Sequence, residues 1–255
     1  MVLKNYFDLK GKSVLVTGAA RGLGKEIALS LAQWEASVII ADLEHPGATE
    51  QAIADMGARC MAVKTDIAEE KQVKALADRV AARFGQADIL INNAGIPQLD
   101  YTPTQDLPVE QWDEILRVNL RGTFLCCKHF GRLMIDKGGG AIVNIASTAG
   151  ITGVPRAPAY CASKAGVILL TKSLALEWAR YNVRVNAVAP HYLKTDLTGG
   201  LRDSDEVYSK LTQPIPLKRF GETSEIAGAV IYLASQASTY TTGTTLTVDG
   251  GYLAQ

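Results

Sequence analysis

Short apolar runs alternate with longer amphipathic stretches along almost the whole chain. The runs are rich in β-branched residues and cover 13–17, 37–41, 59–64, 88–91, 141–146, 183–189 and 244–248. Apolar residues recur at helical spacing in the stretches between them, above all over 69–84, 108–137, 158–180 and 223–234. Nearly continuous apolar strands that alternate with helices are typical of a parallel sheet covered on both faces. The pattern therefore predicts an α/β fold with a doubly wound parallel sheet of about seven strands.

The chain has 255 residues and contains no stretch that resembles a linker, an internal repeat or a low-complexity segment. An α/β chain of this length can form one unit with a large core. We therefore predict a single domain over residues 1–255.

Charge and composition narrow the class of protein. Apolar residues make up 47% of the chain, and 26 basic residues balance 26 acidic ones without a basic tract. Nucleic acid is therefore not an expected partner. Residues 1–11 are polar and lack an apolar signal-peptide core, and no run approaches transmembrane length. We expect a cytoplasmic protein with no membrane partner.

The cysteines show neither CxxC spacing nor a matching histidine pattern. A disulfide framework and a metal site are therefore not expected. Cys126 and Cys127 lie in an apolar helical stretch and are predicted to fill the core, and Cys161 is predicted to pack as well.

A glycine-rich turn follows the first apolar run at once and opens a helical stretch that continues to about Trp34. Strand, glycine turn and helix are the context that a phosphate-binding loop requires. Gly18 allows the tight turn, Gly22 lets the backbone approach a pyrophosphate, and Gly24 permits close contact between helix and strand. The helix N-terminus would then present its unpaired N–H groups to the phosphates.

Asp42 ends the second apolar run, about eighteen residues after Gly24. A carboxylate at this position can accept both ribose hydroxyls of an adenosine and would repel a 2′-phosphate. Asp42 therefore favours NAD over NADP. Arg21, inside the glycine turn, could reach a 2′-phosphate and points weakly the other way.

Several other predicted strands also end in residues that suit a ligand site, namely Asp66, Asn92, Ser147 and Pro190. In open parallel sheets, ligands bind at the carboxyl ends of the strands, where the strand order changes direction. We therefore expect a binding site along this edge.

Tyr160 and Lys164 lie one turn apart on one face of the helix predicted over 158–180, and Ser147 precedes them by thirteen residues. A phenol has a reference pKa of about 10. An ammonium group within ~4–6 Å typically lowers the pKa of an acid by about 1–3 units. The pair therefore predicts an activated acid/base, with Ser147 as a donor to the reacting oxygen.

Over essentially its whole length the chain resembles the short-chain dehydrogenase/reductase family. The matching motifs are Thr17-Gly-x-x-x-Gly-x-Gly24, Asn92-Asn-Ala-Gly95, Asn119, Ser147, Tyr160-x-x-x-Lys164 and Asp249-Gly-Gly251. The resemblance implies a Rossmann-type fold and a catalytic tetrad of Asn119, Ser147, Tyr160 and Lys164. In the scheme of that family the Tyr moves the hydroxyl proton and the Ser binds the same oxygen. The Lys lowers the pKa of the Tyr and holds the nicotinamide ribose, and the Asn anchors a water relay to the Lys.

The resemblance also implies the cofactor contacts, with Thr195 matching the residue that holds the nicotinamide carboxamide. The positions are Gly18, Arg21, Gly22, Leu23, Gly24, Asp42, Leu43, Asp66, Ile67, Asn93, Ala94, Gly95, Tyr160, Lys164, Pro190, Leu193 and Thr195. One position departs from the family, which usually has Pro-Gly after the sixth strand where this chain has Pro190-His191. A packing replacement and a titrating role for His191 both stay open.

Within the family, the segments 159–164, 175–179 and 216–221 are similar to polyol and sugar-acid dehydrogenases, such as gluconate 5-dehydrogenases and arabinitol or galactitol dehydrogenases. This implies hydride transfer between NAD and a secondary alcohol or ketone of a small polyol, sugar or sugar acid. An NADPH-dependent 3-oxoacyl-carrier-protein reductase is an alternative, because ketoacyl reductases share much of the frame. A non-catalytic nucleotide-binding protein is another.

The substrate region is expected at about 192–216 and in the segment between Ser147 and Tyr160. Two prolines stiffen that segment around Arg156, whose guanidinium could hold a carboxylate or a row of hydroxyls. A solvated loop position for Arg156 is the alternative. The candidate substrate contacts are Ser147, Arg156, Tyr160 and His191.

The helices predicted to carry Asn119 and Tyr160 have apolar residues on more than one face, among them Leu116, Phe124, Val167 and Leu174. One sheet face does not need that much apolar surface, and the family resemblance implies that these helices pair across a two-fold axis. We therefore expect a homotetramer.

Overall fold

The computed structural model describes residues 6–98, 100–201 and 203–254. The sequence expectations for residues 1–5, and for residue 202 of the substrate region, fall outside this part of the chain. The strands are β1 (Ser13–Thr17), β2 (Ser37–Asp42), β3 (Cys60–Lys64), β4 (Ile89–Asn92), β5 (Gly140–Ile145), β6 (Val183–Pro190) and β7 (Thr245–Val248). The helices are α1 (Gly22–Gln33), α2 (Gly47–Asp55), α3 (Glu70–Phe84), α4 (Val109–Leu116), α5 (Thr123–Asp136), α6 (Pro158–Trp178), α7 (Asp205–Thr212) and α8 (Thr223–Ala234).

All seven strands form one parallel sheet in the order β3-β2-β1-β4-β5-β6-β7. The chain starts in the middle with β1, winds outward to β3, and returns to β4 on the other side of β1. This reversal places the carboxyl ends of β1 and β4 side by side at the topological switch point. The predicted doubly wound α/β fold is confirmed.

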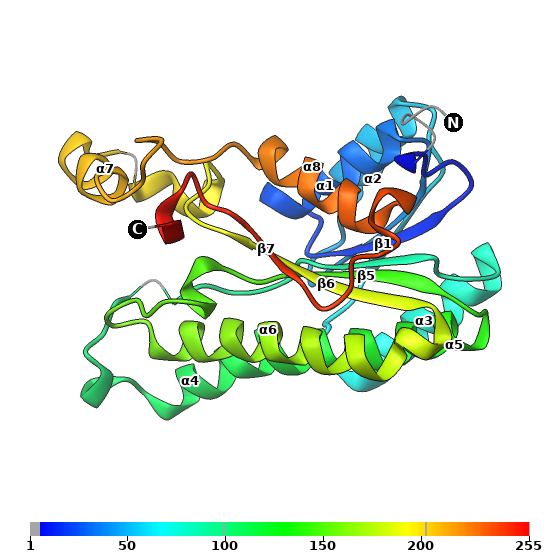
Figure 1. The fold of residues 1–255 in the computed structure, drawn as a ribbon, viewed down its shortest axis with the longest axis horizontal. Helices are drawn as coiled ribbons and strands as arrows, with labels where there is room; N and C mark the ends of the chain where they lie inside the picture. The colour runs from blue at the N-terminus through cyan, green and yellow to red at the C-terminus, as the bar shows by residue number, and fades with distance from the viewer. Residues whose placement is uncertain (1–5, 99, 202, 255) are drawn as a thin grey trace.

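Helices cover both faces of the sheet (Figure 1). α1, α2 and α8 lie on one face, and α3, α4, α5 and α6 lie on the other. The strands supply alternate side chains to the two cores, so that Val14 and Val16 of β1 face the first and Leu15 faces the second. Burial on both sides explains why the strands read as continuous apolar runs.

The helix predicted over 108–137 is not regular. A π-helical turn, Arg117–Gly122, separates α4 from α5. Such a turn holds more residues than an α-helical one and changes which side chains face the sheet beyond it. Asn119 lies in this turn and is 1% exposed, so this polar residue is buried at an irregularity of the helix.

The apolar residues of α5 and α6 lie on more than one face, as the sequence analysis expects. Val167 and Leu174 are buried, whereas Phe124, Leu169 and Leu176 are 45%, 65% and 85% exposed. By length and composition, the segment Pro158–Tyr181 could also cross a membrane, contrary to the expectation that no run is long enough. This is weak evidence, because a core helix of a soluble protein passes the same test.

Candidate active site

The glycine turn after β1 is tightly packed at two glycines and open at the third. Gly18 has φ +66°, and a Cβ placed there would lie 2.7 Å from the Cα of Ala94. A Cβ on Gly24 would overlap the Gly18 carbonyl. Gly22, with φ +56°, would have no heavy atom within 4 Å of its Cβ, and it is the first residue of α1. The turn thus leaves space for a phosphate at the helix N-terminus.

Asn93 fastens this turn to the end of β4. Its Nδ2 donates hydrogen bonds to the carbonyls of Thr17 and Gly18, at 3.0 and 2.9 Å. The hydroxyl of Thr17 accepts in return from the backbone N–H groups of Asn93 and Ala94, both at 3.1 Å. The structure therefore brings the Asn-Asn-Ala-Gly motif against the glycine turn.

Asp42 stands at the end of β2, beside the same turn. Its Oδ2 accepts a hydrogen bond from the Ala20 N–H at 2.8 Å, and its Oδ1 accepts from Glu44 N–H at 3.4 Å. A carboxylate has about four lone-pair positions, so capacity remains for ribose hydroxyls. Leu43 is 63% exposed and Arg21 is exposed, so neither is committed to the core. A carboxylate with free lone pairs, beside an open glycine turn, suits the ribose hydroxyls of the adenosine in a dinucleotide.

Asp66 follows β3, and its carboxylate forms an ion pair with an arginine that the sequence interpretation did not identify. Arg117, the first residue of the π-helical turn, lies 3.3 Å from Asp66 Oδ2. Ile67 is 5% exposed, and a Cβ on Gly122 at the other end of that turn would lie 2.6 Å from it. The π-helical turn therefore contacts both Asp66 and Ile67, two of the predicted cofactor-binding residues.

The same turn carries Asn119. Its Oδ1 accepts from Ile96 N–H at 2.8 Å, and its Nδ2 donates to the Ile96 carbonyl at 2.9 Å and to the Ser163 hydroxyl at 3.1 Å. A Cβ on Gly95 would lie 3.1 Å from Asn119 Oδ1 and 3.6 Å from Lys164 Nζ. Gly95 therefore allows Asn119 and Lys164 to approach each other.

Tyr160, Lys164 and Ser147 converge at the end of β5. Lys164 Nζ donates to the Ile145 carbonyl at 2.8 Å and lies 5.7 Å from the centroid of the Tyr160 ring. Ser147 follows β5 by two residues and caps a short turn by accepting from Ala149 N–H at 3.1 Å. A Cβ on Gly150 would lie 2.6 Å from the Lys164 backbone, so this glycine permits the close packing of that turn on α6.

The expected lowering of the Tyr160 pKa by Lys164 is not what the structure gives. Burial raises the pKa of Tyr160 above its ordinary value, and the hydrogen bond with Ser147 acts in the opposite direction. Burial also lowers the pKa of Lys164 to about 8. The expectation considered the charge of the ammonium group but not the desolvation of both groups, and desolvation is the larger effect here.

His191 lies where β6 and β7 end. Its Nδ1 is 2.8 Å from the hydroxyl of Thr148, the neighbour of Ser147, and its ring stacks on Tyr252 with centroids 3.9 Å apart. Burial lowers the pKa of His191 to about 4, so the ring is neutral near pH 7. The structure thus favours a packing and positioning place over a titrating one.

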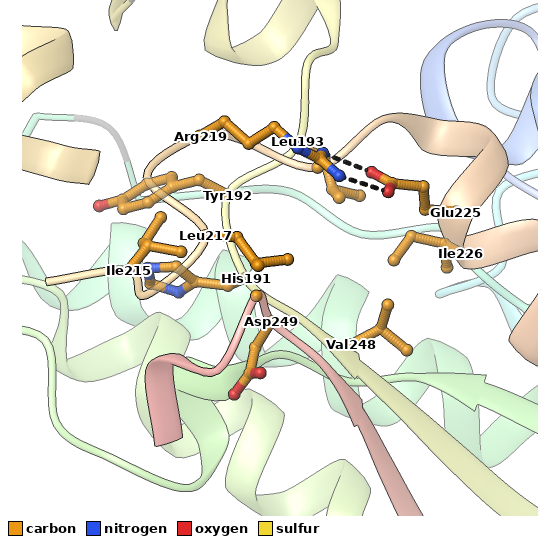
Figure 2. Close-up of a pocket in the computed structure, with 12 residues that line it drawn as sticks. His191, Tyr192, Leu193, Ile215, Leu217, Arg219, Glu225, Ile226, Val248 and Asp249 are labelled. Carbon is orange, nitrogen blue, oxygen red and sulfur yellow. Dashed lines mark hydrogen bonds and ion pairs between the residues drawn. The ribbon is translucent and has the colours of Figure 1, made fainter. Parts of the chain in front are cut away.

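His191, the residue after β6, and Tyr192 line a cavity of about 100 Å³. Figure 2 shows these side chains among the other lining residues. The cavity is lined mainly by apolar side chains, including Leu193, and the Arg219–Glu225 ion pair of 2.7 Å stands at its rim. Leu193 is 8% exposed and pairs with Gly221. Pro190 ends β6 itself, and the N–H of Thr195 donates to Thr198 at 3.2 Å.

Arg156 is exposed and has φ +61°, a left-handed conformation. It makes no hydrogen bond or ion pair with any other residue that the structure describes. The structure does not bring Arg156 into contact with Ser147 or Tyr160, and its solvated loop position is the arrangement observed.

Three residues missed by the sequence interpretation surround Tyr160. Gln98 is 4% exposed, and its Oε1 accepts from the N–H groups of Ala159 and Tyr160 at 3.1 and 3.3 Å. The phenols of Tyr101 and Tyr192 hydrogen-bond to each other, and each interacts electrostatically with the Tyr160 phenol. No local pattern identifies them, because Gln98 reaches α6 across sixty-one residues.

The cysteines pack in or beside the core. Cys126 and Cys127 are fully buried, so their predicted place in the core is confirmed. Cys161 is a free thiol that accepts from Val154 N–H at 3.4 Å. Within 6–98, 100–201 and 203–254, no group of three or more His, Cys, Asp or Glu residues is placed to hold a metal ion.

Comparison with known proteins agrees with this geometry. The family profile described as "Enoyl-(Acyl carrier protein) reductase" matches residues 18–253. The chain is 43% identical to a D-threitol dehydrogenase from Mycolicibacterium smegmatis, over 96% of this chain and 94% of the relative. It is 40% identical to a 3-oxoacyl-(acyl-carrier-protein) reductase from Staphylococcus aureus, over 94% of this chain and 97% of that one.

A solved structure is similar over the full length. The crystal structure of a gluconate 5-dehydrogenase from Burkholderia cenocepacia, in complex with NADP and tartrate, has a TM-score of 0.94. Its sequence is 36% identical, and the match covers 100% of both chains. With the glycine turn, the parallel sheet and the Ser-Tyr-Lys arrangement in place, the chain belongs to the short-chain dehydrogenase/reductase family, an oxidoreductase family that acts on CH–OH groups with a nicotinamide dinucleotide.

Proposed function

We propose that this protein interconverts a secondary hydroxyl and a ketone on a small polyol, sugar or sugar acid, with NAD as its cofactor. The observation that carries the proposal is the convergence of Ser147, Tyr160 and Lys164 at the end of β5, beside the glycine turn. The names of the threitol dehydrogenase and the gluconate 5-dehydrogenase support the substrate class.

Tyr160 is the proton-transfer residue in this proposal. In the oxidation direction its phenolate takes the proton of the substrate hydroxyl, and in reduction its phenol returns that proton. Ser147 donates a hydrogen bond to the same substrate oxygen. Lys164, whose Nζ lies near the Tyr160 ring, would hold the ribose of a bound nicotinamide. A bound nicotinamide ring would accept or supply the hydride.

Asn119 is a positioning residue in this proposal. It uses its side-chain amide to hold Ile96 and Ser163, which fixes Gly95 next to Lys164. A Cβ at Gly95 would crowd Asn119 Oδ1, at 3.1 Å, and would touch Lys164 Nζ at an ordinary contact distance of 3.6 Å. The role of Asn119 is therefore to keep Gly95 and the Lys164 ammonium group in fixed positions relative to each other.

The choice of NAD is supported by the Asp42 carboxylate, which accepts a hydrogen bond from the Ala20 N–H and would repel a 2′-phosphate. The solved gluconate 5-dehydrogenase was crystallised with NADP. The two cofactors must therefore be compared directly on this protein.

A 3-oxoacyl-carrier-protein reductase is the second candidate, favoured by the relative from Staphylococcus aureus. A carrier protein is acidic, so its reductase needs unpaired cations at the entrance. Beyond β6, however, Lys194 is paired with Glu222 and Arg219 with Glu225. Arg156 is exposed and unpaired among the described residues, so the preference for a polyol or sugar acid rests on Asp42 and on the named relatives.

The remaining assignments complete the proposal. The chain forms one cytoplasmic domain with a substrate region at about 192–216, and four copies assemble through the exposed apolar faces of α5 and α6.

The test is a panel of neutral polyols (threitol, arabinitol, galactitol) and gluconate, each with oxidised NAD and oxidised NADP, and an acetoacetyl thioester with reduced NAD and reduced NADP. We expect a polyol or sugar acid to be oxidised with NAD. The reaction is measured by the absorbance of the reduced nicotinamide. Tyr160→Phe, which removes only the phenol oxygen, should lower kcat by about 10²–10⁴-fold and leave cofactor binding intact. Turnover restricted to the thioester, or a Tyr160→Phe enzyme with a third of the normal kcat, would contradict the proposal.

A further inference from the structure

Thr148 carries a buried hydroxyl next to the proposed catalytic serine. The residue is 3% exposed, and its Oγ1 lies 2.8 Å from Nδ1 of His191. This is the one hydrogen bond of the hydroxyl within residues 6–98, 100–201 and 203–254. Buried hydroxyls are normally hydrogen-bonded, so the position of Thr148 depends on the imidazole of His191.

The imidazole is held in place independently of Thr148. Its ring stacks on Tyr252, with centroids 3.9 Å apart and planes 11° apart, and its centroid lies 4.6 Å from that of Tyr192. The N–H of His191 donates to the Val248 carbonyl at 3.3 Å, which joins the end of β6 to the end of β7. His191 is therefore a fixed support, and a glycine at this position could not reach Thr148.

The short turn Thr148–Gly150 connects this support to Ser147. Ser147 caps the turn, because its Oγ accepts from the Ala149 N–H at 3.1 Å. A serine hydroxyl accepts through its lone pairs and donates one hydrogen. The cap therefore orients the hydroxyl and leaves its hydrogen free for the phenol of Tyr160, with which Ser147 is hydrogen-bonded.

The same turn packs tightly on the helix that carries Tyr160. A Cβ on Gly150 would lie only 2.6 Å from the Lys164 backbone. The turn is thus attached to α6 at Gly150 and to the end of β6 at Thr148. These two attachments fix Ser147 relative to Tyr160, and only the second depends on a side-chain hydrogen bond.

We propose that His191 is a positioning residue, which holds the Ser147 hydroxyl against the Tyr160 phenol through its hydrogen bond to Thr148. The inference rests on the proposed function, in which Ser147 and Tyr160 act on the same substrate oxygen. His191 itself neither contacts the substrate nor transfers a proton in this role. Either tautomer of the neutral ring serves, because the Thr148 hydroxyl can donate to Nδ1 or accept from it.

Three single variants separate the hydrogen bond from the ring. His191→Phe keeps a flat ring that can stack on Tyr252 and removes Nδ1. Thr148→Val removes the hydroxyl at the other end of the same bond. His191→Asn loses the ring but keeps a polar atom one bond from Cγ, where Nδ1 stands, so it should restore the bond. Thr239→Val makes the threonine change at an exposed position beside the amino ends of β4 and β5, away from Ser147, and is the matched control.

The measurement is kcat and KM for threitol and for gluconate with saturating NAD, together with the pH midpoint of kcat. We expect His191→Phe and Thr148→Val each to lower kcat by roughly tenfold and to leave KM within about twofold, because Ser147 acts on the transition state. The midpoint should move to higher pH in both, since a displaced Ser147 no longer favours the phenolate. His191→Asn should recover to within about threefold of the wild-type kcat, and Thr239→Val should match the wild type.

Double variants show whether the effect runs through Ser147. His191→Phe added to Ser147→Ala should cause no further loss of kcat and no further shift of the midpoint, because the residue that it positions has lost its hydroxyl. His191→Phe with Thr148→Val should likewise be no worse than either single variant. Losses that multiply in either pair would mean that His191 only supports the fold, and would overturn the inference. Binding of NAD checks that each variant folds, and if His191→Phe fails this check, Thr148→Val in the Ser147→Ala background decides.

The outcomes also separate this inference from the proposed function. If the wild type oxidises threitol or gluconate and His191→Phe keeps kcat within about twofold, the inference is wrong and the proposed function stands. If the wild type acts only on the acetoacetyl thioester, the proposed substrate class fails, and the kcat ratios of the same variants on that reduction decide the inference. If none of these substrates turns over, both fail.

Discussion

The Asp42 carboxylate accepts a hydrogen bond from the Ala20 main-chain N–H at 2.8 Å, so the end of β2 is fastened to the glycine turn. The charge that we propose to discriminate between the cofactors is therefore held in place by the protein itself. Asp42→Asn keeps an oxygen that can accept this bond and removes the charge. We expect the ratio of kcat/KM for NAD over NADP to fall by roughly tenfold or more.

The control for this change is Asp55→Asn, on the exposed end of α2, which should leave the ratio unchanged. A wild-type enzyme that already prefers NADP would show that the Asp42 carboxylate does not select the cofactor.

Ser147 is the group that lowers the pKa of Tyr160 against the effect of burial. Oxidation needs the phenolate, so its rate should rise with pH through the apparent pKa of the site. Removing the hydrogen bond in Ser147→Ala leaves burial unopposed and moves that midpoint to higher pH, in addition to lowering the plateau rate. Profiles of kcat against pH for both proteins test this, and a midpoint that stays in place or moves down would contradict it.

The sheet could be predicted closely because its strands are buried on both faces. Each strand lies within one or two residues of the predicted apolar run, as for β5 at Gly140–Ile145 against 141–146. α2 and α7 were not predicted. They are short, and the only buried residues of α2 are Thr49 and Ile53, so they carry little apolar periodicity.

Some residues of the candidate site could be predicted from the sequence, and others could not. The glycine turn and the Ser-Tyr-Lys arrangement have fixed spacing that a sequence displays directly. Gln98 and Arg117 act through contacts with residues far away in the chain, and nothing in their own neighbourhood marks them. The pKa of Tyr160 depends on how deeply the folded chain buries it, which spacing cannot report.

The buried charge of Lys164 should lower the free energy of unfolding at neutral pH. Its pKa falls from 10.5 to about 8 in the folded protein because of burial. Between these values the unfolded chain binds more protons, so the free energy of unfolding rises as the pH increases from about 8 to about 10.5. Below pH 8 the full penalty is present. Lys164→Met should therefore abolish turnover yet raise the free energy of unfolding at pH 7, by on the order of 1–3 kcal/mol.

Urea denaturation of the cofactor-free protein at pH 7 and pH 10 measures this difference. The gap between Lys164→Met and the wild type should narrow at pH 10. Lys172→Met, on an exposed position of the same helix, controls for loss of charge. A Lys164→Met protein that is less stable at pH 7 would contradict the expectation.

The exposed leucines of α6 test the proposed assembly. Leu169 and Leu176 are seven residues apart, on one face of the helix, and both are mostly exposed. Leu176→Glu should place a charge in the interface between copies and shift the protein from tetramers to smaller species, as measured by light scattering at micromolar concentration. Met56→Glu, at the end of α2, is the control. A monomeric wild type would refute the assembly.

Arg156 provides the sharpest test of the sugar-acid half of the proposed function. Its backbone has φ +61°, so Arg156→Ala would combine loss of the guanidinium with backbone strain. Arg156→Gly removes the guanidinium and keeps the conformation. If the guanidinium swings onto a substrate carboxylate, KM for gluconate should rise roughly tenfold while KM for threitol stays within about twofold. Arg156→Lys keeps the charge but loses the forked donors, so its KM for gluconate should lie between those of the wild type and Arg156→Gly. Equal changes for both substrates would leave Arg156 as the solvated loop residue that its exposure indicates.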